Sequence, residues 1–234
     1  MTMTSKFSVL VLGGALLCGS LVATLAADKA VEPKKAAETK PTVETKKAET
    51  PPPQKVATAV VDAYLKSTFG RAPPEWQARI EPDESMKVCN ATRNQPSHAE
   101  ADKIMASELK RVEFPADGKF LGDWKEGAKI ANNGRGGQFS DDDKTVNGGN
   151  CYACHQMEKA EVSFGTLGPS LTNYGRDRKY DAAEIKQAYT KIYNSQAVIA
   201  CSNMPRFGTN KFLSEQQIKD VMAFLFDPES PVNK

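Results

Sequence analysis

The pattern of apolar positions predicts helices in the second half of the chain. Apolar residues recur there every three or four positions, which is the spacing of one face of an α-helix. Helices are expected to begin at Asp123, Asp181 and Ser214, because a Glu or Gln three residues later completes a capping box in each case. Gly127, inside the first of these helices, is costly unless another backbone approaches it closely. No stretch alternates apolar and polar residues over the length of a convincing strand, so the predicted fold class is all-α.

Two further helices are expected before residue 121. The segment 56–70 has helical periodicity, and a second helix begins at Ser97 with a capping box to Glu100. Pro115 ends the apolar stripe of the second helix. The apolar positions of the two helices are Val60, Val61 and Tyr64 in the first, and Ile104, Met105, Leu109 and Val112 in the second. Residues 56–120 are therefore a predicted, mostly helical extension of a domain at 121–234.

The start of the chain has the pattern of an export signal. Lys6 is followed by an uncharged run, and the small residues at 24–26 are typical of a cleavage site. An uncleaved membrane anchor is the alternative, and the glycines within the run favour cleavage. Cys18 is expected to leave with the signal, because Leu17 is too bulky for lipoprotein processing. Residues 1–26 are the predicted signal peptide, and no membrane anchor is expected after its cleavage.

Composition separates a linker from the folded part. Residues 27–55 consist mostly of Lys, Glu, Ala, Thr and Pro, and cannot bury enough apolar surface to offset the entropy of ordering them. They are a predicted disordered linker. From Val56 onward 23 Lys and Arg residues face 24 Asp and Glu residues, so the folded part is close to neutral. This charge balance gives no reason to expect a nucleic-acid partner.

Residues 151–155, Cys-Tyr-Ala-Cys-His, have the C-x-x-C-H spacing of covalent haem attachment. On a helical turn Cys151 and Cys154 face the same side, so both sulfurs can reach the vinyl groups of one porphyrin, and His155 can ligate the iron. A zinc half-site would need two more ligands, and only His98 with Cys89 or Cys201 remains, without paired spacing. A thioredoxin-like redox pair would need a βαβ unit. The predicted cofactor is one covalently bound haem c.

The second axial ligand must come from another part of the chain. Met204 lies in an irregular stretch 49 residues after His155, and Pro205 stiffens the chain beside it. Met204 is the expected ligand, with Cys201 and His98 as the alternatives. Met157 is too near the motif, and Met222 lies on the apolar stripe of a helix and is expected in the core. A Met/His pair fills both axial positions and favours one-electron transfer.

Two features are expected beside the haem. The carbonyl of Pro169 can accept a hydrogen bond from His155 Nδ1–H, which would orient the ligand, although a plain turn at Gly168-Pro169 is an equal alternative. A rim of mixed charge could pair with haem propionates or a partner, or remain solvated. The cationic residues expected on this rim are Arg176, Arg178, Lys179 and Arg206.

The remaining thiols are expected to pair. With two cysteines taken by the haem and one removed with the signal, Cys89 and Cys201 remain for a disulfide. The bridge would tie the N-terminal extension to the loop just before Met204. Two buried free thiols are the alternative.

The stretch from Leu121 to Asn233 resembles the SoxX family, the monohaem subunit of the bacterial sulfur-oxidising cytochrome pair SoxAX. The resemblance is carried by GDWKEGAKIANNGRGGQFSD, NGGNCYACHQ, GTLGPSLTNYG, ACSNMPRFG and DPESPVN. The first and the last two are far more specific than C-x-x-C-H. The resemblance implies a class I cytochrome c-like haem domain, with Cys151 and Cys154 as attachment sites and His155 and Met204 as axial ligands.

The resemblance also implies a function in periplasmic thiosulfate oxidation. Such a subunit forms a heterodimer with a SoxA-type haem subunit, and the pair is similar to an L-cysteine S-thiosulfotransferase that joins thiosulfate to a cysteine of a carrier protein. The sulfur chemistry would lie on the partner, and this chain would collect electrons for a small cytochrome c acceptor, without activity alone. The alternatives are a generic soluble cytochrome c shuttle and an electron-accepting subunit of another periplasmic dehydrogenase.

Overall fold

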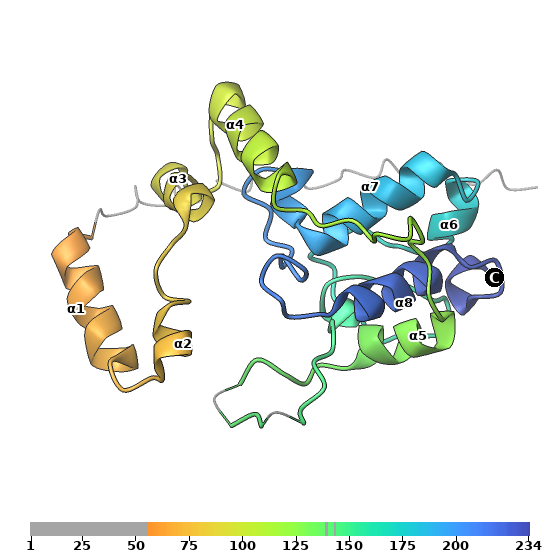
Figure 1. Ribbon diagram of the computed structural model, residues 1–234, viewed down its shortest axis with the longest axis horizontal. Helices are drawn as coiled ribbons and strands as arrows, with labels where there is room; N and C mark the ends of the chain where they lie inside the picture. The colour runs from red at the N-terminus through yellow and green to blue at the C-terminus, as the bar shows by residue number, and fades with distance from the viewer. Residues whose placement is uncertain (1–55, 139, 143) are drawn as a thin grey trace, which may run out of the picture. The chain divides into compact units, whose positions relative to one another are not determined.

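A computed structural model describes residues 56–138, 140–142 and 144–234 (Figure 1). The expected signal peptide and linker lie outside the described residues. The described part has no β-strand, which confirms the all-α prediction. Its α-helices are α1 (Thr58–Phe69), α2 (Pro74–Gln77), α3 (Glu84–Thr92), α4 (His98–Leu109), α5 (Trp124–Asn132), α6 (Tyr174–Asp177), α7 (Ala182–Tyr193) and α8 (Glu215–Phe226). Its short 3₁₀ turns are η1 (Cys151–Ala153), η2 (Ser195–Ala197) and η3 (Pro231–Asn233).

Two of the four predicted capping boxes are confirmed. Ser97 accepts a hydrogen bond from the backbone N–H of Glu100, whose side chain accepts one from the backbone N–H of Ser97. Ser214 and Gln217 make the same exchange at the start of α8. Each box satisfies two backbone donors that the first turn of a helix leaves without partners.

The other two predicted boxes are wrong in one half. Asp123 and Asp181 do cap their helices, accepting hydrogen bonds from backbone N–H groups of the first turn. The Glu three residues on does not return the bond, and Glu126 instead pairs with Lys129 at 2.6 Å. A full box at these positions would bring two carboxylates together, so their repulsion favours the one-sided cap.

Helices α5 and α8 lie side by side in close contact (Figure 1). Gly127 lies where they meet, and a Cβ atom there would overlap the carbonyl of Asp220. The backbone N–H of Gly122 donates to the carbonyl of Lys219 at 2.9 Å just before α5 begins. The close approach expected at Gly127 is therefore present.

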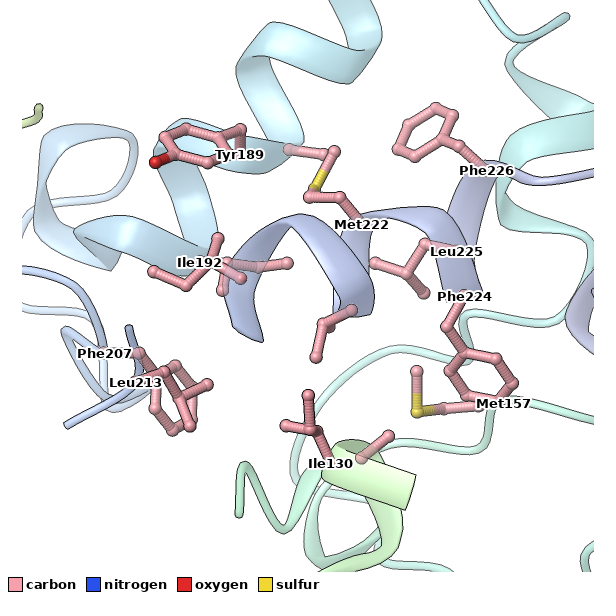
Figure 2. Close-up of a cluster of buried hydrophobic side chains, with 14 of the residues drawn as sticks. Ile130, Met157, Tyr189, Ile192, Phe207, Leu213, Met222, Phe224, Leu225 and Phe226 are labelled. Carbon is pink, nitrogen blue, oxygen red and sulfur yellow. The ribbon is translucent and has the colours of Figure 1, made fainter. Parts of the chain in front are cut away.

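The main core surrounds α8, of which residues 218–226 are all buried. Met222 and Tyr189 lie fully buried in this cluster, and Phe224 packs in the same cluster as Met157 (Figure 2). Burial of large apolar side chains is the main stabilising contribution to such a fold. Met222 is thus a core residue, as its place on an apolar stripe predicts.

The extension and the C-terminal domain belong to one compact unit, residues 56–234. Helix α4 packs on η2, where the side-chain amide of Asn194 donates to the carbonyl of Glu108 at 3.1 Å. Helix α3 was not predicted. Its buried residues are only Ser85 and Cys89, so it has no apolar period to detect.

Helix α1 forms where predicted, but its expected apolar face is not covered by the described residues. Val60 is 60% exposed, Val61 42% and Tyr64 66%, and no residue of α1 is buried. Periodicity predicts that a helix forms and which side is apolar, and it does not say what packs there. None of the helices in the described ranges combines the length and the apolar character needed to cross a bilayer.

Candidate haem site

The C-x-x-C-H motif folds as a single tight turn. Residues Cys151–Ala153 form η1, and the backbone N–H groups of Cys154 and His155 both donate to the carbonyl of Cys151, at 3.1 and 2.9 Å. This helical turn places positions three apart on the same side. Neither Cys151 nor Cys154 is part of a disulfide. The turn therefore has the local geometry that attachment to one porphyrin requires.

A second segment, residues 165–171, runs alongside this turn. The backbone N–H of Gly165 donates to the carbonyl of Tyr152 at 2.8 Å, and that of Gly168 donates to the carbonyl of Cys154 at 2.8 Å. The N–H of Leu171 donates to the carbonyl of Gln156 at 2.7 Å. These backbone hydrogen bonds fix the segment against the motif, and all of them join residues less than 20 positions apart.

His155 is oriented by this segment. Its Nδ1 lies 2.8 Å from the carbonyl oxygen of Pro169, so Nδ1–H donates and Nε2 carries the lone pair that can bind iron. A Cβ at position 168 would overlap the imidazole ring, so Gly168 is required for this close approach. The hydrogen bond expected between His155 and the Pro169 carbonyl is therefore present.

Cys151 does not resemble the reactive cysteine of a redox-active C-x-x-C motif. Burial raises the pKa of Cys151 to about 12. The reactive cysteine of a thioredoxin-like C-x-x-C motif has a lowered pKa, because the thiolate is its nucleophile. The surroundings of Cys151 favour a thiol that becomes a buried thioether over one that exchanges disulfides.

Met204 lies in a loop whose backbone is fixed on both sides. Ser195 Oγ donates to the carbonyl of Met204 at 2.5 Å, and the N–H of Met204 donates to Ser202 Oγ at 3.3 Å. Met204 is half-buried and packs against the main core, whereas Met157 is 1% exposed and Met222 is fully buried. Of these three methionines, Met157 and Met222 lie in the interior of the core and Met204 lies at its edge.

A disulfide joins the extension to this loop. Cys89 of α3 is bonded to Cys201, with the two Cα atoms 5.4 Å apart and a sequence separation of 112. Both cysteines are buried in a small cluster with Ile104 of α4. Because its sulfur is bonded to Cys89, Cys201 does not offer a thiolate to iron. His98, the other alternative ligand, is an exposed residue in the first turn of α4.

Comparison with known proteins agrees with this geometry. The family model for cytochrome c matches residues 125–227. A protein of Aquifex aeolicus (strain VF5), named as an uncharacterized lipoprotein, is 31% identical over 189 residues, which is 77% of this chain and 87% of that protein. Residues 125–227 of the chain form a cytochrome c domain. The chain therefore carries covalently bound haem c, and its role is haem-based electron transfer.

The residues of this cytochrome fit the haem. Cys151 and Cys154 would hold the porphyrin through thioethers, and His155 would bind the iron with its Nε2. The bound group supplies one-electron exchange at its iron. The chain's own contribution is to fix the ring of His155 and to exclude water with the core around Met157 and Tyr152.

Sequence reasoning misjudged one charged residue of the cytochrome. Arg206, expected on an exposed rim, has a side chain only 9% exposed and pairs with Asp83 and Glu108. The signal for this cluster was the position of Glu108, which falls four residues after the buried Ile104 on the inward side of α4. A carboxylate on a buried face requires a partner, and that partner comes from the loop after Met204.

Two other rim cations are placed at the surface, as expected. The guanidinium of Arg178 stacks on the ring of Tyr174 at 3.6 Å and pairs with Glu184 at 3.3 Å. Arg176 lies 3.9 Å from Asp177, and both side chains are at least half exposed. Pairs this exposed contribute about 0–1 kcal/mol to stability.

Proposed function

We propose that this cytochrome is the monohaem electron-transfer subunit of a SoxAX-type complex, an L-cysteine S-thiosulfotransferase of periplasmic thiosulfate oxidation. The observation that carries the proposal is the set of segments beyond C-x-x-C-H, which resemble SoxX over nearly the whole haem domain. In this role the chain accepts electrons released on a SoxA-type haem subunit and passes them to a small cytochrome c.

Two of the segments that carry the resemblance contact each other, which supports treating them as one structural unit. The amide of Asn233, in DPESPVN, accepts hydrogen bonds from the N–H groups of Gly175 and Arg176 at 3.0 and 3.1 Å. The N–H of Asn173, in GTLGPSLTNYG, donates to the carbonyl of Val232 at 2.7 Å. The end of the chain thereby fixes the segment that follows the His155-orienting turn.

The proposal assigns Met204 as the second axial ligand. The support is its loop position with Pro205, a backbone fixed by Ser195 and Ser202, and the use of Met157 and Met222 in the core. A Met/His pair raises the reduction potential and leaves no open position at the iron. Both consequences suit a one-electron carrier.

Sulfur chemistry is assigned to the partner because every cysteine among the described residues already has another role. Cys89 and Cys201 are bonded to each other, and Cys151 and Cys154 are assigned to the haem. Joining thiosulfate to a carrier thiol forms one S–S bond, releases the thiol proton and releases two electrons. One haem accepts one electron, so this subunit must discharge between the two transfers or share the pair with the haem of its partner.

The proposal places the protein in the periplasm. The support is the export-signal pattern of residues 1–26 and the chemistry of a disulfide, which persists in oxidising compartments. The name of the Aquifex aeolicus relative describes a lipoprotein, which is also an exported class. The mass of the mature N-terminal peptide separates a chain beginning near Ala27 from one that retains a lipid on Cys18.

Native purification tests the proposal. The full-length holoprotein is purified from periplasm without an affinity tag, and the haem content of each co-purifying chain is determined. We expect a stable partner with its own haem, and reduction of this subunit by thiosulfate only when that partner and the carrier protein are present. A monomer that purifies alone, or that thiosulfate reduces without a partner, would instead identify a generic electron shuttle.

A further inference from the structure

The N-terminal extension reaches the Met204 loop through a buried carboxylate as well as through the disulfide. Glu108, in the last turn of α4, is 1% exposed. Its Oε2 accepts from the side-chain amide of Asn194 at 2.7 Å, and its Oε1 accepts from Ser85 Oγ at 2.5 Å. Arg111 donates to both oxygens, at 3.1 and 3.2 Å. A buried carboxylate with this many partners has one fixed position.

One set of contacts runs from this carboxylate to the C-terminal side of Met204. Arg206 Nη1 donates to Asp83 Oδ2 at 2.7 Å and lies 3.4 Å from each carboxylate oxygen of Glu108. Asp83 is also the N-cap of α3. The side chain of Arg206, two residues after Met204, therefore connects this loop to two helices of the extension.

A second set of contacts runs to the carbonyl of Met204 itself. The side chain of Asn194, held by Glu108, accepts a hydrogen bond from the N–H of Gln196 at 3.2 Å and caps η2. Ser195, the first residue of η2, donates from its hydroxyl to the Met204 carbonyl. Asn194 and Ser195 are both fully buried. The same carboxylate thus fixes the Met204 loop by two routes.

The carboxylates of this cluster are ionised at neutral pH. Burial alone would raise the pKa of Glu108, but hydrogen bonds from Asn194 and Ser85 and the charges of Arg111 and Arg206 together lower it. The pKa of Asp83 is lowered in the same way against the effect of its burial. Hydrogen bonds between ionised groups are stronger than neutral ones, and partial burial limits their screening by salt.

We propose that Glu108 and Arg206 are positioning residues for the axial methionine, through which the N-terminal extension holds the Met204 loop in its ligating conformation and slows release of the thioether from iron. The inference rests on the proposed ligation by Met204. It gives residues 56–120 a role in electron transfer. A ligand that seldom dissociates would keep both axial positions filled and the reduction potential constant.

The test is ligand exchange in the full-length ferric holoprotein. Imidazole at fixed concentration displaces the methionine, and loss of the far-red sulfur-to-iron absorption band gives the rate. Glu108→Gln and Arg206→Gln should each raise this rate about tenfold or more, the effect expected for loss of a hydrogen bond to a charged group. In the double variant the exchange rate should rise by less than the product of the two single increases, because both changes remove the same link. Arg206→Lys keeps the charge and loses the planar guanidinium group. Its exchange rate should lie between those of wild type and Arg206→Gln.

Matched controls separate positioning from a general loss of stability. Glu184→Gln breaks the exposed pair with Arg178 and should leave the exchange rate unchanged. Val232→Ala removes buried volume from the main core, and should lower the thermal midpoint without changing the exchange rate. If Glu108→Gln does not fold, Asp83→Asn removes a partly exposed partner of Arg206 and should raise the rate several-fold.

The outcomes that overturn the inference differ from those that overturn the ligand assignment. If Met204→Ala abolishes the band while Glu108→Gln, Arg206→Gln and Asp83→Asn exchange at the wild-type rate, the positioning inference is wrong and the ligation stands. A rate raised as much by Val232→Ala as by Glu108→Gln also overturns it. If Met204→Ala retains the band, the ligand assignment is wrong and the inference fails with it.

Discussion

The His155 side and the Met204 side of the proposed haem site are built from different kinds of contact. On the His155 side, residues 151–171 fold on themselves through backbone hydrogen bonds and the contact between His155 Nδ1 and the Pro169 carbonyl. On the Met204 side, local hydrogen bonds with Ser195 and Ser202 are joined by contacts about a hundred positions away: a disulfide to Cys89 and ion pairs to the extension. One side is therefore specified locally, whereas the other depends on a distant segment that folds against it.

This difference predicts how the two sides respond when the extension is loosened. Short-range contacts cost little loop-closure entropy and persist in local structure, whereas long-range contacts are lost together. The His155 side should remain formed while the Met204 side opens.

The largest effect is expected from the attachment cysteines. Cys151→Ala with Cys154→Ala should abolish covalent haem completely, because no other free cysteine lies in the described part of the chain. The measurement is haem retention on the polypeptide after acid–organic extraction, with Cys89→Ser as the control that keeps both thioethers. Covalent haem that survives in the double variant would contradict the assignment of the motif.

Removing the proposed axial thioether should have the next largest effect. Met204→Ala should lower the reduction potential by a sizeable part of the roughly 0.8 V that axial ligands span, because a weaker ligand such as water replaces sulfur. Potentiometric titration of the holoprotein measures it. Met222→Leu, a change in the core, should leave the potential within a few tens of millivolts. A potential unchanged in Met204→Ala would remove the basis of the proposed ligation.

Opening the disulfide should destabilise the Met204 side. Replacing Cys89 and Cys201 together by Ser releases a constraint spanning 112 positions. The loop-entropy model then predicts a loss of about 4–5 kcal/mol, which native-state relaxation reduces. Chemical unfolding with two probes measures it: the far-red band should be lost at lower denaturant than helical circular dichroism. If the far-red band and the circular dichroism of the variant are lost at the same denaturant concentration, the two sides do not differ in stability.

Acid should have a smaller effect, directed at the same side. The pKa values of Asp83 and Glu108 are lowered in the folded state, so their ionisation stabilises the protein above their ordinary pKa values, about 4. That stabilisation is lost as the pH falls from about 5 through the folded-state pKa values. Unfolding free energies measured from pH 7 to pH 3 should decline less steeply in Glu108→Gln than in wild type. If the unfolding free energies of wild type and Glu108→Gln decline in parallel, ionisation of Glu108 does not contribute to the pH dependence of stability.

The smallest effect is expected at the exposed ion pair between Arg178 and Glu184. Glu184→Gln removes an ion pair whose side chains are 36% and 44% exposed. Its contribution should be about 0.5 kcal/mol or less, and the loss should shrink further at high salt. Thermal unfolding at two ionic strengths measures it. A loss as large as that of Glu108→Gln would mean that burial of the ion pairs does not determine their contribution.

The same contrast explains what the sequence could predict. The haem turn, the hydrogen bond from His155 and the caps at Ser97 and Ser214 depend on residues that are near one another in the chain, so their spacing is informative. The close approach at Gly127 was also visible, because glycine inside a helix is costly without one.

The features that the sequence did not predict have different causes. Arg206 was expected on an exposed rim because nothing within ten positions indicates the pairing with Glu108, which lies 98 positions earlier. Helix α3 has too few buried residues to show a period, and the carboxylates after Asp123 and Asp181 turn to nearby cations. Sequence periodicity reports which residues are apolar, and it does not report which segments meet.

The central claim is that one haem lies between the locally built His155 side and the extension-held Met204 side. Proton NMR of the ferrous full-length holoprotein tests it most directly, because the ring current of the porphyrin shifts an iron-bound methionine methyl far upfield. We predict one such methyl resonance, present in wild type and Met222→Leu and absent in Met204→Leu. A shifted methyl that persists in Met204→Leu, or that disappears in Met222→Leu alone, would contradict the account.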